Sequence, residues 1–334
     1  MSTSYTPPYS VTEPITNLIV EIGESVGSLM AWQHMEKNPR LRRDNRIRTI
    51  HASLAIENNS LSLDQVTDII NGKRVLGEPS EIREVKNAYE AYDQLLGFNP
   101  YSIEDLLRAH QILMADLVKE AGQFRTGGVG IFKGQQIVHM APPAEMVYGH
   151  ISNLLNWLKS SKEHPLIKSC VFHYEFEFIH PFSDGNGRMG RMWNTLLLYQ
   201  WKPIFAWIPV ESIIRERQAE YYNALGQADS QAESTPFVEF LLRAILDTLK
   251  SFEQYPVAST DSSMPPHIRL FLETLGDEEL SVTELMHRLG LTSRASFRKT
   301  YLQPCLEEHL IEMTLPDTPK SRYQKYRAIK KNSK

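Results

Sequence analysis

Apolar residues recur at the spacing of an α-helix along most of the chain. Between residues 15 and 30, Ile15, Leu18 and Ile22 fall on one face, as in an amphipathic helix. The same spacing predicts helices over residues 50–58, 81–96, 102–117, 144–160, 165–179, 188–201, 213–227 and 236–254. Ser60 or Ser62 is placed to cap a further helix that starts within residues 60–64. Strand signals are scarce, so the pattern predicts an all-α fold class.

One stretch departs from the helical pattern. In residues 128–140, Ile131 and Phe132 are separated from Ile137 and Val138 by a short polar segment that contains Gly134. Two short apolar runs around a glycine turn are typical of a β-hairpin. We therefore expect a mostly helical domain that carries one hairpin.

The chain composition changes near residue 255. Residues 255–266 are small, polar and end in two prolines, which is typical of a linker between domains. Beyond it, residues 267–275, 281–291 and 293–298 are predicted helices, and residues 311–315 and 323–329 are candidate strands. This order outlines a winged helix. The predicted domains are thus an N-terminal helical region (1–100), a second helical domain (101–254), the linker, and a winged-helix domain (267–334).

Bulk composition narrows the class of protein. The 334 residues are 42% hydrophobic and 23% charged, with a net charge of −4, which indicates a globular protein whose main role is not to coat nucleic acid or membrane. Two cysteines make a disulfide framework improbable, and no export signal or apolar run of about 18–20 residues is visible. The expected compartment is the cytoplasm, without membrane contact.

Residues 180–191 carry the clearest chemistry, in the order His-Pro-Phe-Ser-Asp-Gly-Asn-Gly-Arg-Met-Gly-Arg. Glycines that lead into a helix allow backbone N–H groups to surround phosphate oxygens. Asp184 can hold Mg²⁺ together with those phosphates, and Arg188 and Arg191 can reach one polyphosphate from the first turns of the helix. His180 titrates near neutrality and is suited to act as a general base. The lysine motif of P-loop proteins is absent from the sequence.

This segment matches every fixed position of the Fic family signature, H-x-F-x-[DE]-G-N-G-R-x-x-R, and residues 45–245 as a whole resemble that family. The resemblance implies that residues 101–254 form a Fic (Fido) catalytic domain, which is helical and carries a β-hairpin flap. It implies that His180 deprotonates the target hydroxyl, that Phe182 is buried and fixes the loop, and that Asp184 binds Mg²⁺. It also implies an ATP-binding segment formed by Gly185, Asn186, Gly187, Arg188, Met189, Gly190 and Arg191, with Arg188 on the β-phosphate and Arg191 on the γ-phosphate.

A metal site offers a competing interpretation of the same region. His173, Glu177 and His180 are spaced as neighbours at the end of one helix. No fourth ligand lies nearby in the sequence, so zinc is disfavoured. We expect His173 to be a packing residue.

An upstream segment resembles the inhibitory motif of the same family, [ST]-x-x-x-E-[GN]. It comprises Ser53, Glu57 and Asn58. The resemblance implies that Glu57 pairs with Arg191 and takes the place of the γ-phosphate, so that ATP binds with its α-phosphate turned from in-line attack. Ser53 is expected to orient a short helix and Asn58 to end it.

Two further regions are assigned from the resemblance. The hairpin is expected to act as a flap that aligns the target segment by strand addition, through Ile131, Phe132, Val138 and His139. Tyr221 and Tyr222 are expected on the adenine side of the ATP site, although core packing is an alternative for at least one of them.

The sequence thus favours a protein adenylyltransferase that uses ATP and Mg²⁺, modifies a Tyr, Thr or Ser hydroxyl of a protein or of itself, releases pyrophosphate and is autoinhibited. A homodimer is possible. Removal of AMP by the same site, with Glu57 orienting water, stays open. So does a transcription regulator that binds DNA through Arg294, Arg298 and the basic residues of 320–334.

Overall fold

The computed structural model describes residues 5–31, 39–133, 136–254, 266–276, 278–289, 291, 293–308, 310–316, 318, 321 and 324–329. The chain forms two compact units, Met1–Pro256 and Val257–Lys334. The expected linker, apart from Pro266, lies outside the described residues.

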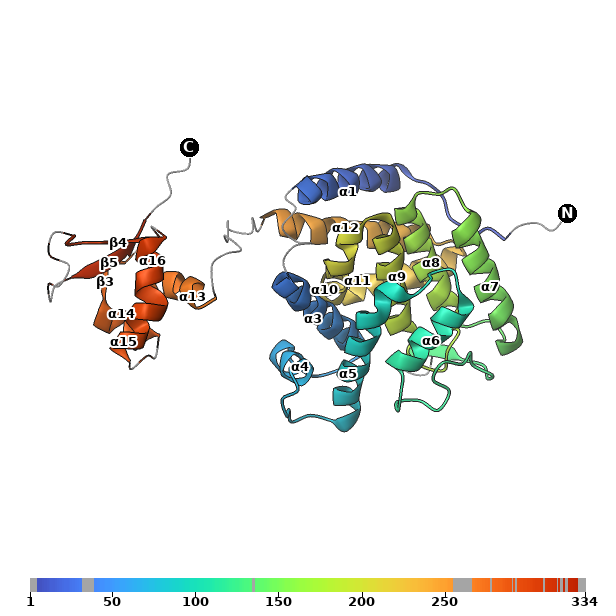
Figure 1. Ribbon diagram of the computed structural model, residues 1–334. Helices are drawn as coiled ribbons and strands as arrows, with labels where there is room; N and C mark the ends of the chain where they lie inside the picture. Colours follow the sequence, from blue (N-terminus) through green and yellow to red (C-terminus); the bar gives the residue numbers. More distant parts are fainter. Residues whose placement is uncertain are drawn as a thin grey trace. The chain divides into compact units, whose positions relative to one another are not determined.

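The first unit is helical, as its sequence pattern predicts (Figure 1). Its α-helices are α1 (Glu13–Ala31), α3 (Pro39–Ile56), α4 (Leu63–Ile70), α5 (Pro79–Gln94), α6 (Ile103–Leu113), α7 (Ala144–Ser160), α8 (Pro165–Ile179), α9 (Asn186–Trp201), α10 (Val210–Glu216), α11 (Gln218–Gln231) and α12 (Thr235–Gln254). Short 3₁₀ turns follow at Leu95–Gly97 and Pro203–Trp207. Among the described residues, no helix is long and apolar enough to cross a membrane.

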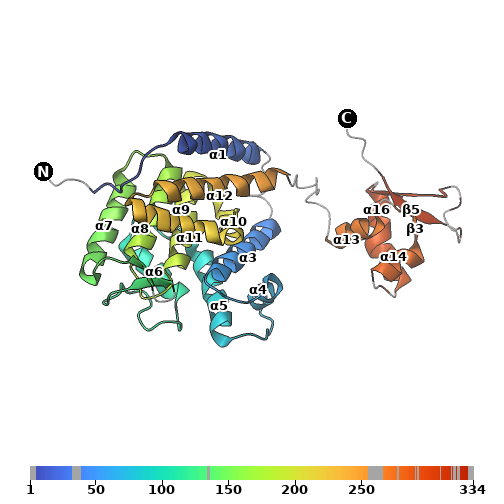
Figure 2. The same cartoon turned by 180° about the vertical axis from the view of Figure 1, so that it is seen from behind.

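Helices α8 and α9 form the centre of this unit. Both are buried on nearly every face, which explains why their apolar residues show little one-sided periodicity. They pack against each other, while α7 and α12 cover α8 and α1 lies along α12 (Figures 1 and 2). The loop that joins α8 to α9 is residues 180–185, so the core holds the two helices that carry the predicted chemistry.

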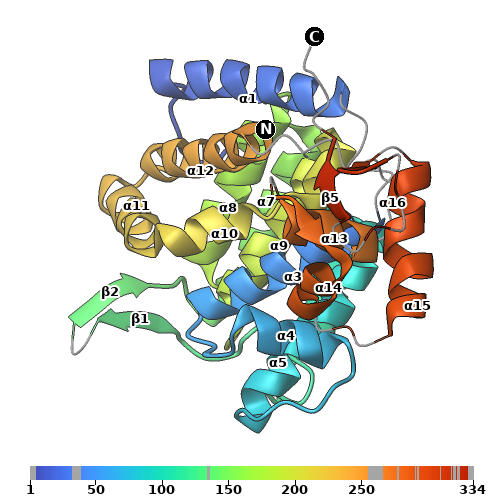
Figure 3. The ribbon, with the colours of Figure 1, turned by 90° about the vertical axis from the view of Figure 1, so that its left-hand side faces the viewer.

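The expected hairpin is present. Strands β1 (Gly130–Lys133) and β2 (Gln136–Met140) pair antiparallel, with an irregularity between Ile131 and Phe132. Figure 3 shows the hairpin projecting from the helices. Its turn residues, and the side chains of Ile131, Phe132, Val138 and His139, lie outside what the structure describes.

The second unit has the predicted order of helices followed by a hairpin. Helices α13 (Pro266–Leu275), α14 (Val282–Arg288), α15 (Arg294–Phe297) and α16 (Gln303–Glu307) precede strands β4 (Ile311–Met313) and β5 (Lys325–Ala328). A two-residue strand that the pattern did not predict, β3 (Leu280–Ser281), completes a sheet of order β3-β5-β4. Ser281 caps α14 with a reciprocal capping box to Glu284.

Several helix boundaries differ from those expected. Helix α3 begins at Pro39 and not near residue 50, because its basic first half is held by tertiary contacts: Arg42 and Arg46 lie 5.0 and 4.8 Å from the ring centre of Trp207. One predicted helix over 213–227 is two, with a break at Arg217. Helix α6 ends at Leu113 and not at residue 117.

The helix predicted over residues 293–298 is followed by further helical turns that include Pro304. A π-helical stretch, Arg298–Leu302, precedes it, and Pro304 then occupies the first turn of α16. A proline is tolerated there because the preceding stretch is not regular α-helix. No i→i−4 hydrogen bond needs its N–H, and its ring does not clash with a carbonyl of a preceding α-helical turn.

Candidate active site

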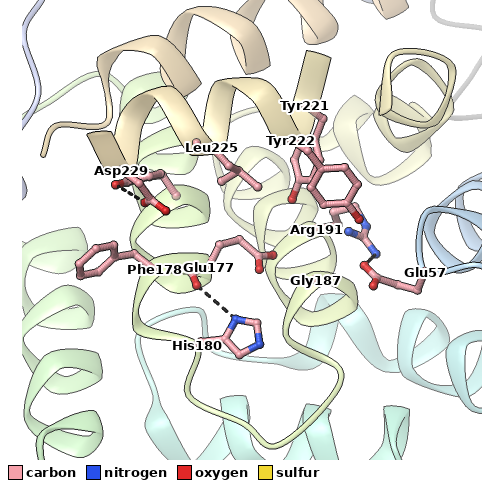
Figure 4. Close-up of a pocket in the computed structure, with 12 residues that line it drawn as sticks. Glu57, Glu177, Phe178, His180, Gly187, Arg191, Tyr221, Tyr222, Leu225 and Asp229 are labelled. Carbon is pink, nitrogen blue, oxygen red and sulfur yellow. Dashed lines mark hydrogen bonds and ion pairs between the residues drawn. The ribbon is translucent and has the colours of Figure 1, made fainter. Parts of the chain in front are cut away.

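His180 ends helix α8 in a left-handed conformation, with φ of 48°. Its N–H still bonds to the carbonyl of Phe176 at 3.0 Å, so the residue is fixed to the helix end. The half-buried imidazole places Nδ1 3.3 Å from the carbonyl of Glu177 (Figure 4). A proton on Nδ1 satisfies that carbonyl and leaves the lone pair on Nε2, which is the tautomer that a general base requires.

The guanidinium of Arg125 holds this end of the loop. Its Nε donates to the carbonyl of His180 at 2.7 Å and one Nη2–H to that of Ile179 at 3.2 Å. The remaining donors reach Gly127 at 2.8 Å and Pro142 at 2.5 Å, at the two ends of the hairpin segment. Arg125 is 4% exposed, so one buried side chain joins the His180 loop to the base of the hairpin.

Phe182 is fully buried, as expected, and stacks on the His110 ring with centroids 3.6 Å apart. Nδ1 of His110 accepts from the N–H of Gly122 at 2.9 Å, so Nε2–H donates to the carbonyl of Asp184 at 3.0 Å. Burial lowers the pKa of His110 to about 4, and the ring is therefore neutral at pH 7. The amide of Asn186 bonds to both the N–H and the carbonyl of Phe182 at 2.9 Å, which closes the loop.

Helix α9 begins directly after this loop. Gly185 precedes it with φ of 83°, and a Cβ at Gly185 would lie 2.6 Å from Sδ of Met114. Glycine is therefore required at residue 185, both for its positive φ and for the lack of space for a Cβ. The first intrahelical bond runs from the N–H of Met189 to Gly185, so the N–H groups of Asn186, Gly187 and Arg188 point out of the helix end, where they can bind phosphate oxygens. The Asn186 side chain faces the loop, so only its backbone can serve this purpose.

Two charged residues flank the helix start. Nη1 of Arg188 lies 2.8 Å from Oε1 of Glu84, and its Nη2 lies 3.2 Å from Oδ1 of Asp184. Asp184 is 59% exposed, and its Oδ1 also accepts the N–H of Gly185. Among the described residues, no three potential ligands gather as a metal cluster. One exposed carboxylate beside a helix end whose N–H groups point outward nevertheless fits Mg²⁺, which usually takes one or two carboxylates and completes its shell with phosphate oxygens.

Arg191 is buried and held from the upstream helix α3. Its Nη2 lies 2.8 Å from Oε1 of Glu57 and 3.0 Å from the carbonyl of Ser53, and its Nε donates to Oγ of Ser53 at 3.1 Å. Burial alone would lower the pKa of Arg191, but the Glu57 carboxylate raises it overall. Ser53 lies in the last turn of the 18-residue helix α3, not on the short helix expected. Glu57 follows the helix directly, and the next residue, Asn58, has a φ of 68°, which takes the chain out of the helical conformation.

A cavity of about 280 Å³ opens between these elements (Figure 4). It is lined by Glu57, Tyr174, Glu177, Phe178, His180, Gly187, Arg191, Tyr221, Tyr222, Leu225, Gly226 and Asp229. Six residues predicted for the site are among them. The other predicted residues do not line it: Asp184 and Gly185 belong to the loop, Asn186 and Arg188 to the first turn of α9, and Met189 and Gly190 are buried in that helix.

The two tyrosines differ in burial. Tyr221 is 1% exposed and packs against Phe237, with its hydroxyl 3.2 Å from Nε2 of His173. Tyr222 is 49% exposed, so it is the ring that a bound base can reach. His173 is fully buried, and burial lowers its pKa to about 3. The packing role expected for His173 is confirmed.

The second unit shows mixed charge around its third helix. Arg294 and Arg298 are exposed, as a nucleic-acid surface needs. Arg327, however, pairs with Glu312 at 2.6 Å, and Arg288 pairs with Glu278 at 2.8 Å. Most of residues 320–334 lie outside the described chain, so DNA binding stays a prediction.

Sequence reasoning missed three side chains that support the site: Arg125, His110 and Glu84. Each is an isolated polar residue whose partners lie 55, 74 and 104 positions away. No local pattern marks such a residue.

Comparison with known proteins agrees with this geometry. Residues 100–198 match the model of the Fic/DOC family, and residues 266–328 match that of the Filamentation induced by cAMP protein Fic-like, C-terminal domain. The protein adenylyltransferase fic-1 of Caenorhabditis briggsae is 30% identical over 228 residues, which cover 63% of this chain and 42% of that protein. The protein adenylyltransferase Fic of Aedes aegypti is 29% identical over 241 residues, which cover 69% of this chain and 46% of that protein. The chain thus spans about half the length of these relatives or less.

Solved structures extend the match to the whole chain. Fic-1 of Caenorhabditis elegans shares the fold, with a TM-score of 0.61 at 21% identity and coverage of 74% of each chain. A Fic family protein from Desulfovibrio desulfuricans is 52% identical, with a TM-score of 0.77, over 99% of this chain and 100% of that one. A match of this identity and extent, together with the His180 loop and the arginines of α9, shows that the chain belongs to the Fic family.

Proposed function

We propose that this protein is an adenylyltransferase that moves AMP from ATP onto a Ser, Thr or Tyr hydroxyl of a protein and releases pyrophosphate. The observation that carries the proposal is the placement of His180, the N-terminus of α9 and Arg191 around one cavity. A base, a phosphate-binding helix end and a cation are the groups that nucleotidyl transfer needs in one place. The names of the relatives support the same activity.

In the proposed reaction, Nε2 of His180 accepts the proton of the target hydroxyl. The oxygen then forms a bond to the α-phosphorus, the bond from that phosphorus to the bridging oxygen of the β-phosphate breaks, and pyrophosphate leaves. The hydrogen bond from Nδ1 of His180 to Glu177 fixes the required tautomer. Arg125 holds the carbonyl of His180 and thereby the position of the ring.

The phosphates are bound by the start of α9. N–H groups of Gly187 and its neighbours would bind oxygens of the α- and β-phosphates, with Arg188 on the β-phosphate and Arg191 on the γ-phosphate. Asp184 would hold Mg²⁺, which when bound neutralises phosphate charge. Tyr222 would stack on adenine, and the edge of the hairpin would pair with the target strand.

We further propose that Glu57 inhibits the enzyme. Its carboxylate occupies Nη2 of Arg191, one of the donors that would bind the γ-phosphate. ATP that enters beside this ion pair loses a phosphate contact, so its α-phosphate is not held in line with the attacking hydroxyl. The pair forms within one chain, so inhibition needs no second protein.

Removal of AMP from a modified protein is the second candidate. One observation favours it: the Glu57 carboxylate, 32% exposed, lines the same cavity as His180. A carboxylate so placed can orient a water molecule toward an AMP–protein bond.

A labelling experiment distinguishes AMP transfer from AMP removal. We would incubate the Glu57→Gly variant with α-labelled ATP and a cell lysate, with Glu57→Gly/His180→Ala as the matched control. We expect labelled protein bands with the first variant, and a rate about 10²–10⁴-fold lower with the second at similar ATP affinity. Equal labelling by both variants would remove His180 from the reaction. Loss of label from pre-modified bands, only when wild-type protein is added, would favour AMP removal.

A further inference from the structure

The first arginine of the signature helix, Arg188, is held by a carboxylate from another helix. Glu84 lies on α5, and its Oε1 is 2.8 Å from Nη1 of Arg188. Arg188 is 6% exposed and Glu84 21%. A guanidinium so deeply buried needs a fixed counter-charge, because its removal from water is otherwise strongly unfavourable.

Arg188 has two carboxylate partners with different surroundings. Glu84 is the closer and more buried, while Asp184 lies at 3.2 Å and is 59% exposed. Nε of Arg188 is buried and has no hydrogen-bond partner among the described residues. A buried donor without a partner is the state expected of a group whose acceptor arrives with a ligand.

We propose that Glu84 is a positioning residue of the nucleotide site, which anchors Nη1 of Arg188 so that the remaining N–H groups meet the phosphates. The guanidinium is planar, so fixing one nitrogen fixes the direction of the other two. Asp184 would hold Mg²⁺, and Nη2 of Arg188, which lies beside Asp184, would then meet a phosphate oxygen while Nη1 stays with Glu84. The inference rests on the phosphate role of Arg188 proposed above.

Glu84 also forms a hydrogen bond to the segment that carries Glu57. Oε2 of Glu84 accepts from Nδ2 of Asn59 at 2.8 Å, two residues after Glu57, and Asn59 is 8% exposed. The N–H groups of Asn59 and Glu57 both bond to the carbonyl of Leu54. One carboxylate therefore fixes Arg188 and the turn that places Glu57 on Arg191.

The test measures ATP binding apart from catalysis. In the Glu57→Gly background, we compare Glu84→Gln and Glu84→Asp with Glu81→Gln. Glu81 lies on the same helix and binds Ser60 at 2.6 and 2.9 Å, so its variant loosens the same segment without touching Arg188. We expect Glu84→Gln to weaken ATP binding in EDTA about 10-fold or more, since bonds to charged groups are the stronger ones. Glu84→Asp should fall between it and the parent, and Glu81→Gln should stay within about 2-fold of the parent.

A second measurement, the Mg²⁺ dependence of self-labelling, follows from the two carboxylate partners of Arg188, Glu84 and Asp184. Without Glu84, Arg188 pairs more fully with Asp184, so half-maximal self-labelling should require several-fold more Mg²⁺. Unchanged or tighter ATP binding by Glu84→Gln overturns the proposal, as does an equal loss in Glu81→Gln. If the parent labels nothing but Glu84→Gln still weakens ATP binding, the proposed reaction fails and the anchor stands. Thermal melting of each variant checks its folding, and Glu84→Asp keeps the test decisive if Glu84→Gln is unfolded.

Discussion

Nη2 of Arg191 lies 2.8 Å from Oε1 of Glu57, although 134 positions separate the two residues in the chain. Arg191 is 1% exposed and Glu57 32%, so the pair sits at the boundary between the core and the cavity. A ligand can therefore meet the carboxylate, but it reaches the guanidinium only where Glu57 gives way.

Glu57→Gly should bind ATP productively and label itself or other proteins faster than the wild type, because Nη2 of Arg191 then meets the γ-phosphate. The variant should also melt lower, because the buried Arg191 guanidinium loses its counter-charge, which costs up to about 3–5 kcal/mol in a fully buried pair and less in this partly exposed one. Self-labelling with α-labelled ATP and calorimetric melting are the two measurements.

Arg191→Ala provides the control for that gain. It should lower labelling in both backgrounds, and a double-mutant cycle on stability should be strongly non-additive, by about 0.5–3 kcal/mol. If Glu57→Gly is no more active than the wild type, the inhibitory role of Glu57 is wrong, while the transferase proposal stands.

Gly187→Ala should destabilise the wild type through this same ion pair. A Cβ there would lie 2.3 Å from Oε1 of Glu57 and 2.9 Å from Nη1 of Arg191. Overpacking of this kind typically costs about 1–3 kcal/mol. In the Glu57→Gly background the shorter of the two clashes is absent, so the cost should be smaller. Urea unfolding measures both values.

Gly149→Ala on helix α7 is the matched control, because an added Cβ there meets no atom within 4 Å. It should be neutral or stabilising by up to about 1 kcal/mol. An equal cost of Gly187→Ala in both backgrounds would show that Glu57 does not approach Gly187 in solution.

Much of the site follows from the sequence because its residues are consecutive. The glycines and the helix start after His180 follow from residue type and order, whereas the burial of Phe182 was predicted from the resemblance to the family. The contact of Glu57 with Arg191 was also predicted, although only the resemblance to a family motif indicated it.

The rest depends on contacts across the fold. Arg125 and Glu84 show no local periodicity, and their roles become visible only when the carbonyl of His180 and the guanidinium of Arg188 are placed beside them. The start of α3 was missed for a similar reason. Arg46 stabilises that helix through Trp207, which lies far along the chain.

Asp184→Asn should raise the Mg²⁺ concentration needed for labelling while leaving the fold intact. The side chain is 59% exposed, so little stability depends on it, whereas its charge is what the cation binds. The Glu57→Gly background makes the activity measurable. As control, Asp64→Asn on helix α4 should leave the metal dependence unchanged. An unaltered Mg²⁺ titration for Asp184→Asn would place the metal ligand elsewhere.

His110 should make the fold sensitive to mild acid. Burial lowers its pKa to about 4 from an ordinary 6.5, with the charge of Arg188 acting in the same direction and that of Asp184 opposing it. Between these values the unfolded chain binds more protons than the folded one, so stability is complete above pH 6.5 and falls as the pH drops toward 4. The loss attributable to His110 between pH 7 and pH 5 is roughly 2 kcal/mol.

His110→Gln removes that titration. It should be less stable than the wild type at pH 7, because the stack on Phe182 is lost, but its stability should change less between pH 7 and pH 5. His173, with a pKa lowered to about 3 by burial, and Glu211, with one raised to about 7 by burial, titrate in both proteins, so the difference between the two unfolding curves isolates His110. Urea unfolding at the two pH values gives four free energies. Parallel losses in the two proteins would mean that His110 is protonated in the folded state, and its Nδ1 could then not accept the N–H of Gly122.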